Sequence, residues 1–170
     1  MVARLVAGVS ACGVDEGRLS GQHALVSIII KFFVAPDDEA AAAVVDHGPD
    51  EAFESLVFGN FDVEEAMIEW ESILTGRSFD ELVEADEPAV VADPGDGEGP
   101  MVLAASKVLQ DALAAANVPR LVEVGELWVQ ERAAEGEVFD PEVATRILGD
   151  LAELARSIGR RGGSLYCWVA

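Results

Sequence analysis

The chain has 170 residues, of which 51% are hydrophobic, so a single globular domain is expected and a disordered chain is excluded. Its 32 acidic residues against 11 Lys and Arg give a net charge of −21, which repels phosphate backbones and anionic lipid surfaces. We therefore expect no direct binding to nucleic acid or to a membrane, and any charged partner should be basic. No apolar run is long enough to cross a bilayer.

The first 26 residues contain four glycines and little periodicity. We interpret residues 1–26 as a flexible or wrongly included leader, with translation starting near Val26, and place the protein in the cytoplasm. A second interpretation stays open, because residues 9–12 fit the small-residue pattern that precedes a lipidated cysteine. In that case the chain is a lipoprotein anchored at Cys12.

Three elements are expected after this leader. Residues 27–34 are rich in β-branched and aromatic side chains and stop before Pro36, which predicts a buried strand. The acidic residues 37–39 favour the start of a helix, because negative charge stabilises the positive end of the helix dipole. A short extended segment is predicted at residues 55–62, with a turn signal at Gly59 and Asn60.

The next helix has the clearest boundaries in the first half of the chain. Asp62 and Glu65 form a pair like a capping box, and Gly76 is placed to end the helix. Apolar residues, Trp70 among them, recur at helical spacing and predict a buried face. The opposite face, which we expect to be exposed, carries four glutamates: Glu64, Glu65, Glu69 and Glu71.

The middle of the chain is predicted as a short helix, an extended segment, a loop and a long helix. Ser78 and Glu81 repeat the capping pattern, and residues 89–92 follow as an extended segment. Glycine and proline make residues 93–100 the clearest loop. Its carboxylates suggest calcium, but their spacing does not match an EF-hand, so we expect no metal. High helix propensity predicts one helix over residues 101–117.

The last third of the chain is predicted as two helices and a strand. Pro119 opens the first helix, and Asp140 with Pro141 marks the start of the second. Residues 164–170 are rich in β-forming side chains and predict a strand. Helical periodicity assigns these side chains to the core: Trp70, Ile73, Leu74, Trp128, Leu148, Leu151 and Leu154.

Strands at both ends of residues 27–170, with helices between them, predict one α+β domain. A small sheet that includes the N- and C-terminal strands packs against several helices. We expect residues 28–34 and 165–169 to share this sheet, because neither strand alone could bury its apolar face.

No residue pattern assigns a catalytic group. The chain lacks a phosphate-binding glycine motif and a serine nucleophile elbow. His23 and His47 have no second ligand at metal spacing, so neither a metal nor a cofactor is expected. Cys167 lies within the last strand, where a free cysteine usually acts as a small hydrophobic residue. Two distant cysteines favour a reducing compartment.

Several segments together resemble the YfbM-like family of bacterial proteins. They are a strand followed at once by a short helix, the sequence "EWESILTG" at residues 69–76, a helix that leads to Trp128, and a final helix, glycine turn and strand. The resemblance spans most of residues 27–170 and departs from the family at the N-terminal extension and the middle loop. It implies an α+β fold and supplies no catalytic residues. Some family members are suspected of acting in toxin–immunity systems.

Two classes of function stay open. The first is a non-catalytic acidic module that binds a basic protein, as an immunity protein or inhibitor would, through Glu64, Glu65, Glu69 and Glu71. The second is a small enzyme with an acidic cleft. A pocket with converging carboxylates of perturbed pKa would favour the enzyme, whereas a broad acidic face would favour the binding module.

Overall fold

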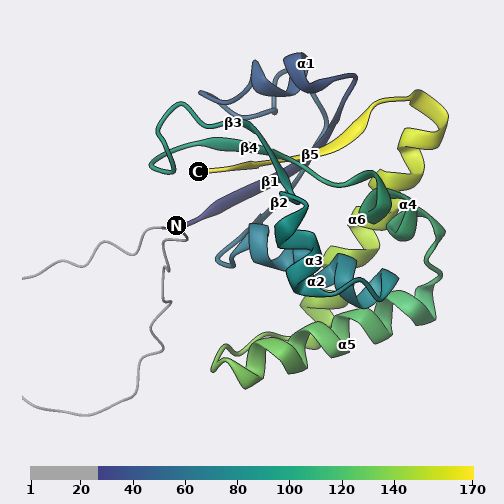
Figure 1. Cartoon of the computed structure of the whole chain (residues 1–170). Helices are drawn as coiled ribbons and strands as arrows, with labels where there is room; N and C mark the ends of the chain where they lie inside the picture. The colour runs from purple at the N-terminus through teal and green to yellow at the C-terminus, as the bar shows by residue number, and fades with distance from the viewer. Residues whose placement is uncertain (1–26) are drawn as a thin grey trace, which may run out of the picture.

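The structure, a computed structural model, describes residues 27–170 as one α+β domain. The expectations for residues 1–26, including lipidation at Cys12, lie outside this range. Five antiparallel strands form one sheet in the order β2-β1-β5-β4-β3 (Figure 1). The strands are β1 (Ile29–Ala35), β2 (Ser55–Gly59), β3 (Ala89–Ala92), β4 (Met101–Ala104) and β5 (Ser164–Val169).

The first and last strands lie side by side in the centre of the sheet. Ile30 of β1 is opposite Val169 of β5, and Ala35 is opposite Ser164. The prediction that the two terminal strands share one sheet is therefore confirmed. Each strand alternates its side chains between two faces, so that Phe32 contacts the main helical layer and Phe33 contacts the other side.

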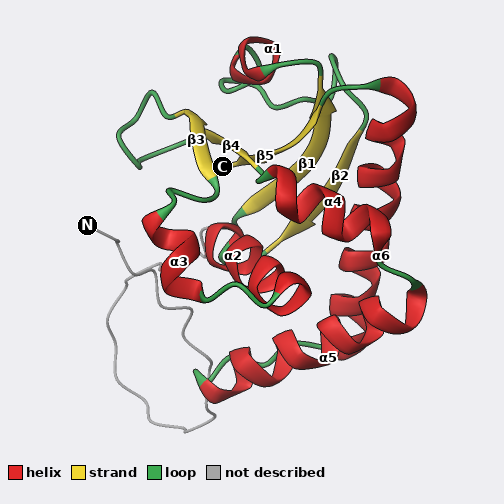
Figure 2. Ribbon diagram, turned by 45° about the vertical axis from the view of Figure 1, so that its right-hand side comes forward, coloured by secondary structure: helices red, strands yellow, loops and turns green. Residues whose placement is uncertain are grey.

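The helices lie mainly on one face of the sheet (Figure 2). A long amphipathic helix, α6, packs against both α4 and α5 and leads into β5. A short helix, α1, lies on the opposite face of the sheet from the other helices (Figure 1). The helices are α1 (Asp38–Ala42), α2 (Val63–Thr75), α3 (Phe79–Glu84), α4 (Lys107–Ala115), α5 (Val118–Ala134) and α6 (Pro141–Arg161).

The predicted helix starts are confirmed by their caps. The side chain of Asp62 accepts a 3.0 Å hydrogen bond from the backbone N–H of Glu65. Ser78 and Glu81 form a reciprocal capping box at the start of α3. Gly76 ends α2 at φ 78°, a left-handed conformation that glycine adopts without steric cost.

The prediction of one helix over residues 101–117 is wrong. Residues 101–104 form β4, which pairs with β3 on one side and with β5 on the other. Ser106 then starts α4, where its hydroxyl accepts a 2.9 Å hydrogen bond from the N–H of Leu109. Both Val102 and Leu103 are buried on opposite faces of the sheet. Two-sided strand pairing and burial therefore override the local helix propensity.

The main core fills the space between the sheet and the helices. Trp70 of α2 and Trp128 of α5 meet there edge to face, with ring centroids 5.1 Å apart. Among the predicted core residues, Trp70, Trp128, Leu148 and Leu151 are fully buried. The other three are only partly buried and pack against the rim of the core: Ile73, Leu74 and Leu154.

Residues 36–54, named here the acidic cap, cover part of the other face of the sheet. The cap includes α1 and the turns after it. Tyr166 of β5 donates a 2.7 Å hydrogen bond to Asp38, and the indole N–H of Trp168 donates one of 2.8 Å to the carbonyl of Val45. Apolar contacts between the cap and the sheet form a second, smaller core.

Candidate functional site

The structure separates the four glutamates that were assigned to one exposed face of α2. Glu64 is exposed and Glu65 is partly exposed. Glu69 and Glu71 are only 7% and 2% exposed, so the expectation that they face solvent is wrong. Each of the two buried glutamates pairs with an arginine, which explains how a carboxylate is tolerated inside the domain.

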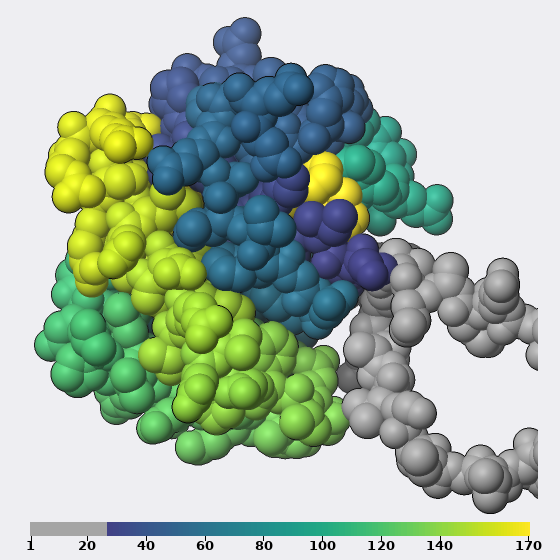
Figure 3. Space-filling view, turned by 180° about the vertical axis from the view of Figure 1, so that it is seen from behind, coloured from purple at the N-terminus to yellow at the C-terminus, as the bar shows by residue number. Residues whose placement is uncertain are grey.

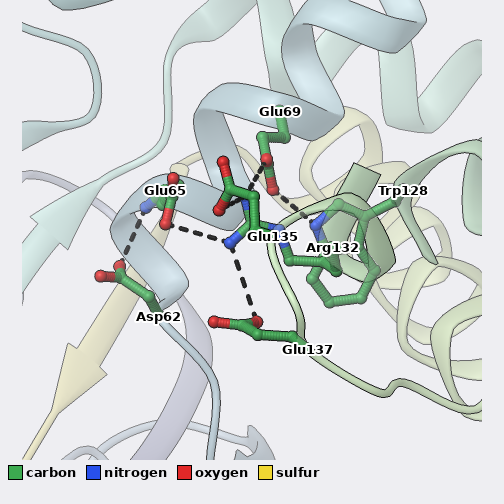
Figure 4. Close-up of polar contacts among 7 residues, drawn as sticks. All are labelled: Asp62, Glu65, Glu69, Trp128, Arg132, Glu135 and Glu137. Carbon is green, nitrogen blue, oxygen red and sulfur yellow. Dashed lines mark hydrogen bonds and ion pairs between the residues drawn. The ribbon is translucent and has the colours of Figure 1, made fainter. Parts of the chain in front are cut away.

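Glu69 belongs to a buried ionic cluster that joins α2 to α5 (Figure 4). One of its oxygens accepts a 2.7 Å hydrogen bond from the indole N–H of Trp128. Its other oxygen pairs with Arg132, which is 4% exposed. Arg132 also pairs with three further carboxylates, those of Glu65 at 3.1 Å, Glu135 at 3.0 Å and Glu137 at 3.7 Å.

The cluster changes the acidity of its members. Burial raises the pKa of Glu69 to about 7, against the opposing effects of Arg132 and Trp128. Burial also acts to lower the pKa of Arg132, but the surrounding carboxylates outweigh it and raise that pKa. Arg132 therefore stays charged, whereas Glu69 gains a proton more easily than an ordinary glutamate does. None of the cluster's residues lines the groove between α6 and the acidic cap.

Glu71 forms a second buried contact, between α2 and the start of α4. It accepts a 2.5 Å hydrogen bond from the hydroxyl of Ser106 and pairs with Arg77 at 2.9 Å. The same Ser106 hydroxyl caps α4. Glu71 is therefore held by groups that also organise the helix ends, and it has a structural role in the fold.

The acidic cap carries more exposed carboxylates than the α2 face does. Its sequence contains no Lys or Arg. Within the described residues, the one ion pair made by a cap carboxylate joins Asp50 to Lys31 of the sheet. The cap therefore presents a surface of negative charge, and its acidic residues are Asp37, Asp38, Glu39, Asp46, Asp50, Glu51 and Glu54.

A groove of about 600 Å³, named here the α6 groove, borders the cap. One wall is residues 52–54 of the cap with Leu56 of β2, and the other is the second half of α6. The end of β1, including Val34, and the turn at Gly162 and Gly163 also line it. Figure 3 views this side of the molecule, with α6 in yellow-green beside the blue of residues 50–60.

The α6 groove has opposite charges at its two ends. Asp150 and Glu153 lie on the α6 wall, and Arg160 and Arg161 lie at the C-terminal end of the same helix. Ten residues separate Asp150 from Arg160, which corresponds to about 15 Å along a helix axis. Neither arginine has an ion-pair partner within residues 27–170. The groove therefore offers carboxylates at one end and unpaired guanidinium groups at the other.

No sequence pattern indicated this groove directly. The polar side chains on the α6 wall recur at helical spacing, which identifies them as one flank of the helix. The opposite wall comes from residues about one hundred positions earlier, and no local sequence pattern indicates that these residues lie beside α6. Among residues 27–170, no group of three or more His, Cys, Asp or Glu could hold a metal ion.

None of the helices that the structure describes is both long and apolar enough to span a membrane. Comparisons with protein-family models, with curated proteins and with solved structures found no match to the chain. The resemblance to the YfbM-like family therefore remains a prediction.

Proposed function

We propose that this chain is a non-catalytic module that binds a basic protein through the acidic cap and the adjoining α6 groove. The observation that carries the proposal is the continuity of the two features. Residues 52–54 belong to the cap and at the same time form one wall of the groove. A basic partner would meet the carboxylates of the cap first and could insert a side chain beside Glu54, Asp150 and Glu153.

The charge of the cap suits recognition more than stability. Exposed carboxylates contribute little to folding, and a dense set of like charges repels itself. The same charges attract a basic partner over a Debye length, about 8 Å at physiological salt, and accelerate its association. Binding should therefore weaken as the salt concentration rises.

The groove supports binding over catalysis. The hydroxyl of Ser157, which lines the groove, donates to the carbonyl of Leu154 and not to a basic side chain. A serine nucleophile requires a base within hydrogen-bond reach. Glu69, whose pKa is raised to about 7, lies in the buried cluster and not in the groove. An enzyme with an acidic cleft remains the alternative proposal, with its catalytic residues unassigned.

The resemblance to the YfbM-like family adds a class of partner to this proposal. If the chain acts in a toxin–immunity system, the partner is a basic toxin that the module holds inactive. The acidic cap and the −21 net charge are compatible with such a role, because an inhibitor of a basic protein needs complementary charge.

The proposal is tested by affinity capture from the native host, with the full chain as bait and mass spectrometry to identify the retained proteins. One variant combines Glu39→Gln, Glu51→Gln and Glu54→Gln, three exposed cap residues that make no described ion pair. A control variant combines Asp80→Asn, Glu84→Gln and Asp86→Asn on and after α3, which removes the same charge elsewhere.

The cap variant should lose a basic partner that the wild-type chain and the α3 variant both retain. Equal retention by all three proteins would contradict the role of the cap. Loss by both variants would show that net charge, and not the cap, determines capture. A third variant, Glu64→Gln with Glu65→Gln, tests the part of the α2 face that remains accessible.

A further inference from the structure

In the part of the chain that the structure describes, β2 lies at one edge of the sheet and pairs only with β1. The backbone N–H of Asn60 donates a 3.2 Å hydrogen bond to the carbonyl of Ile28. Backbone groups alternate in direction along an antiparallel strand, so those of Phe58 and Leu56 also point toward β1. The N–H and C=O groups of the residues between them point away from the sheet: Ser55, Val57 and Gly59.

These outward backbone groups are available to a further strand. None of them makes a hydrogen bond with another residue in the range 27–170. The side chain of Val57 is 60% exposed. Five consecutive residues of β2 pair in regular register with β1, whereas the other edge strand, β3, has an irregular register between Val90 and Ala92. A regular, uncovered edge is a template for strand addition, and an irregular one is a poor template.

The α6 groove lies beside the start of this open edge. Leu56 of β2 lines the groove, and Asp150 and Glu153 face it from α6. A strand added to β2 would place alternate side chains on the groove side, because side chains alternate between the two faces of a sheet. On the other face, Val57 lies opposite Lys31, whose side chain reaches Asp50 of the cap. Both faces of an added strand would therefore lie close to acidic groups.

Charge decides which kind of strand can occupy this edge. A second copy of the chain would bring a further net charge of −21 against the same surface, which disfavours self-pairing. A basic segment has the complementary charge. The charge of the groove also changes sign along its length, because Arg160 and Arg161 lie at the opposite end from Asp150. An extended segment covers the separation of about 15 Å in four to five residues.

We propose that the edge of β2 and the α6 groove bind an extended segment of a basic protein by strand addition. A Lys or Arg of this segment lies against Asp150 and Glu153, and a carboxylate four residues away lies against Arg160 and Arg161. The inference rests on the proposed function, since it names how the basic partner is held. Backbone hydrogen bonds supply affinity in this mode, and the side chains in the groove supply specificity.

The test uses the full chain and a library of acetylated, amidated pentapeptides. Each peptide has Lys or Arg at one end, Asp or Glu at the other, and varied residues between them. Binding is measured by titration, and amide hydrogen exchange locates the contact. Peptides that bind should slow exchange at the N–H groups of Ser55, Val57 and Gly59, which have no hydrogen-bond partner among residues 27–170.

Two variants at one position separate strand addition from other contacts. Val57→Pro removes an outward N–H, a change that an edge strand tolerates because that N–H takes no part in the sheet. It should weaken peptide binding at least tenfold. Val57→Thr keeps the N–H and should bind as the wild type does. If Val57→Pro does not fold, the exchange pattern of the wild-type chain still decides the question.

The contribution of Asp150 and Glu153 to peptide binding is tested separately. Asp150→Asn with Glu153→Gln should weaken binding of peptides that end in Lys or Arg, and should leave peptides with Gln at that end unaffected. The absence of binding by every library member would overturn the inference. So would protection of amides outside β2, full affinity of Val57→Pro, or a dimer of the free chain through β2.

The experiments distinguish failure of strand addition at β2 from failure of the cap's role in binding. If host capture depends on the cap carboxylates but is unchanged by Val57→Pro, the basic partner binds by another mode and strand addition is wrong. If library peptides bind at β2 while the cap variant captures the same host proteins as the wild type, strand addition stands and the recognition role of the cap is wrong.

Discussion

Glu69 of α2 and Arg132 of α5 form a buried ion pair between residues that are 63 positions apart in the chain. The pair places a negative charge inside the domain and surrounds the matching positive charge with further carboxylates. A buried arginine with this many partners fixes the relative position of two helices, because loss of the arginine leaves Glu69 buried without a compensating charge.

Removing the arginine should therefore destabilise the domain strongly. Among the described residues, Arg132→Met leaves the buried Glu69 with Trp128 as its one remaining partner, and a broken buried pair typically costs about 3–5 kcal/mol. The free energy of unfolding, measured by urea titration, should fall by that order. Arg146→Met on α6 is the control, because Arg146 is exposed and makes no ion pair within residues 27–170. Equal stability of the two variants would show that the cluster contributes nothing.

The raised pKa of Glu69 predicts a pH dependence of stability. Burial raises this pKa from 4.5 to about 7, so between these values the folded state holds a proton that the unfolded state releases. The stability that this proton provides is present below about pH 4.5 and is lost as the pH rises through 7. Glu69→Gln lacks this titration and keeps an acceptor for Trp128.

The measurement is the difference in unfolding free energy between Glu69→Gln and the wild type, taken at several pH values. The variant should gain stability relative to the wild type as the pH rises from about 4.5 to about 7. Comparing the two proteins cancels the titration of the other carboxylates. Parallel stability profiles would mean that Glu69 has an ordinary pKa in the folded state.

The core prediction concerns the long helix α6. Leu151 is 0% exposed and lies in the main core. Leu151→Ala should lower the free energy of unfolding by about 2–5 kcal/mol, because the deletion leaves a cavity that the neighbours only partly fill. Val143→Ala on the same helix removes an exposed side chain and should have a much smaller effect. Similar costs for the two changes would place Leu151 outside the core.

Burial of the Cys167 thiol predicts that the folded protein protects it from thiol reagents. The side chain is fully buried, and burial raises its pKa well above the usual value, which disfavours the reactive thiolate. In a Cys12→Ser variant, Cys167 is the remaining thiol. It should react with an aromatic disulfide reagent only after denaturation. Rapid reaction in the folded protein would mean that β5 opens locally.

Local sequence signals were sufficient for most of the elements. Asp62, Ser78 and Asp140 each start a helix as predicted, because capping depends on residues within one turn. The terminal strands were recognised from their β-branched and aromatic composition. Residues 101–104 were assigned to a helix because their strand conformation depends on β3 and β5, which are distant in sequence.

The candidate site was predicted less well, for a related physical reason. Helical periodicity places Glu69 on α2 beside the buried face that carries Trp70, so it does not decide whether Glu69 is exposed. The sequence does not reveal that α5 covers this side of α2. Arg132 and Glu69 become neighbours through packing alone. The α6 groove likewise requires residues 52–54 to approach the end of the last helix. The acidic cap was not assigned as a binding surface from the sequence, although it contains seven acidic residues and no Lys or Arg.

The position of β5 affects how the protein can fold during synthesis. β5 is the last element of the chain, yet it lies between β1 and β4, and Ala170 exchanges backbone hydrogen bonds with Ile29. Until residues 164–169 have been synthesised, β1 with β2 and β3 with β4 are separate pairs of strands whose inner edges have no partner strand. The sheet therefore forms only after the most distant of these elements in sequence is available, and the inner edges are open to other partners until then.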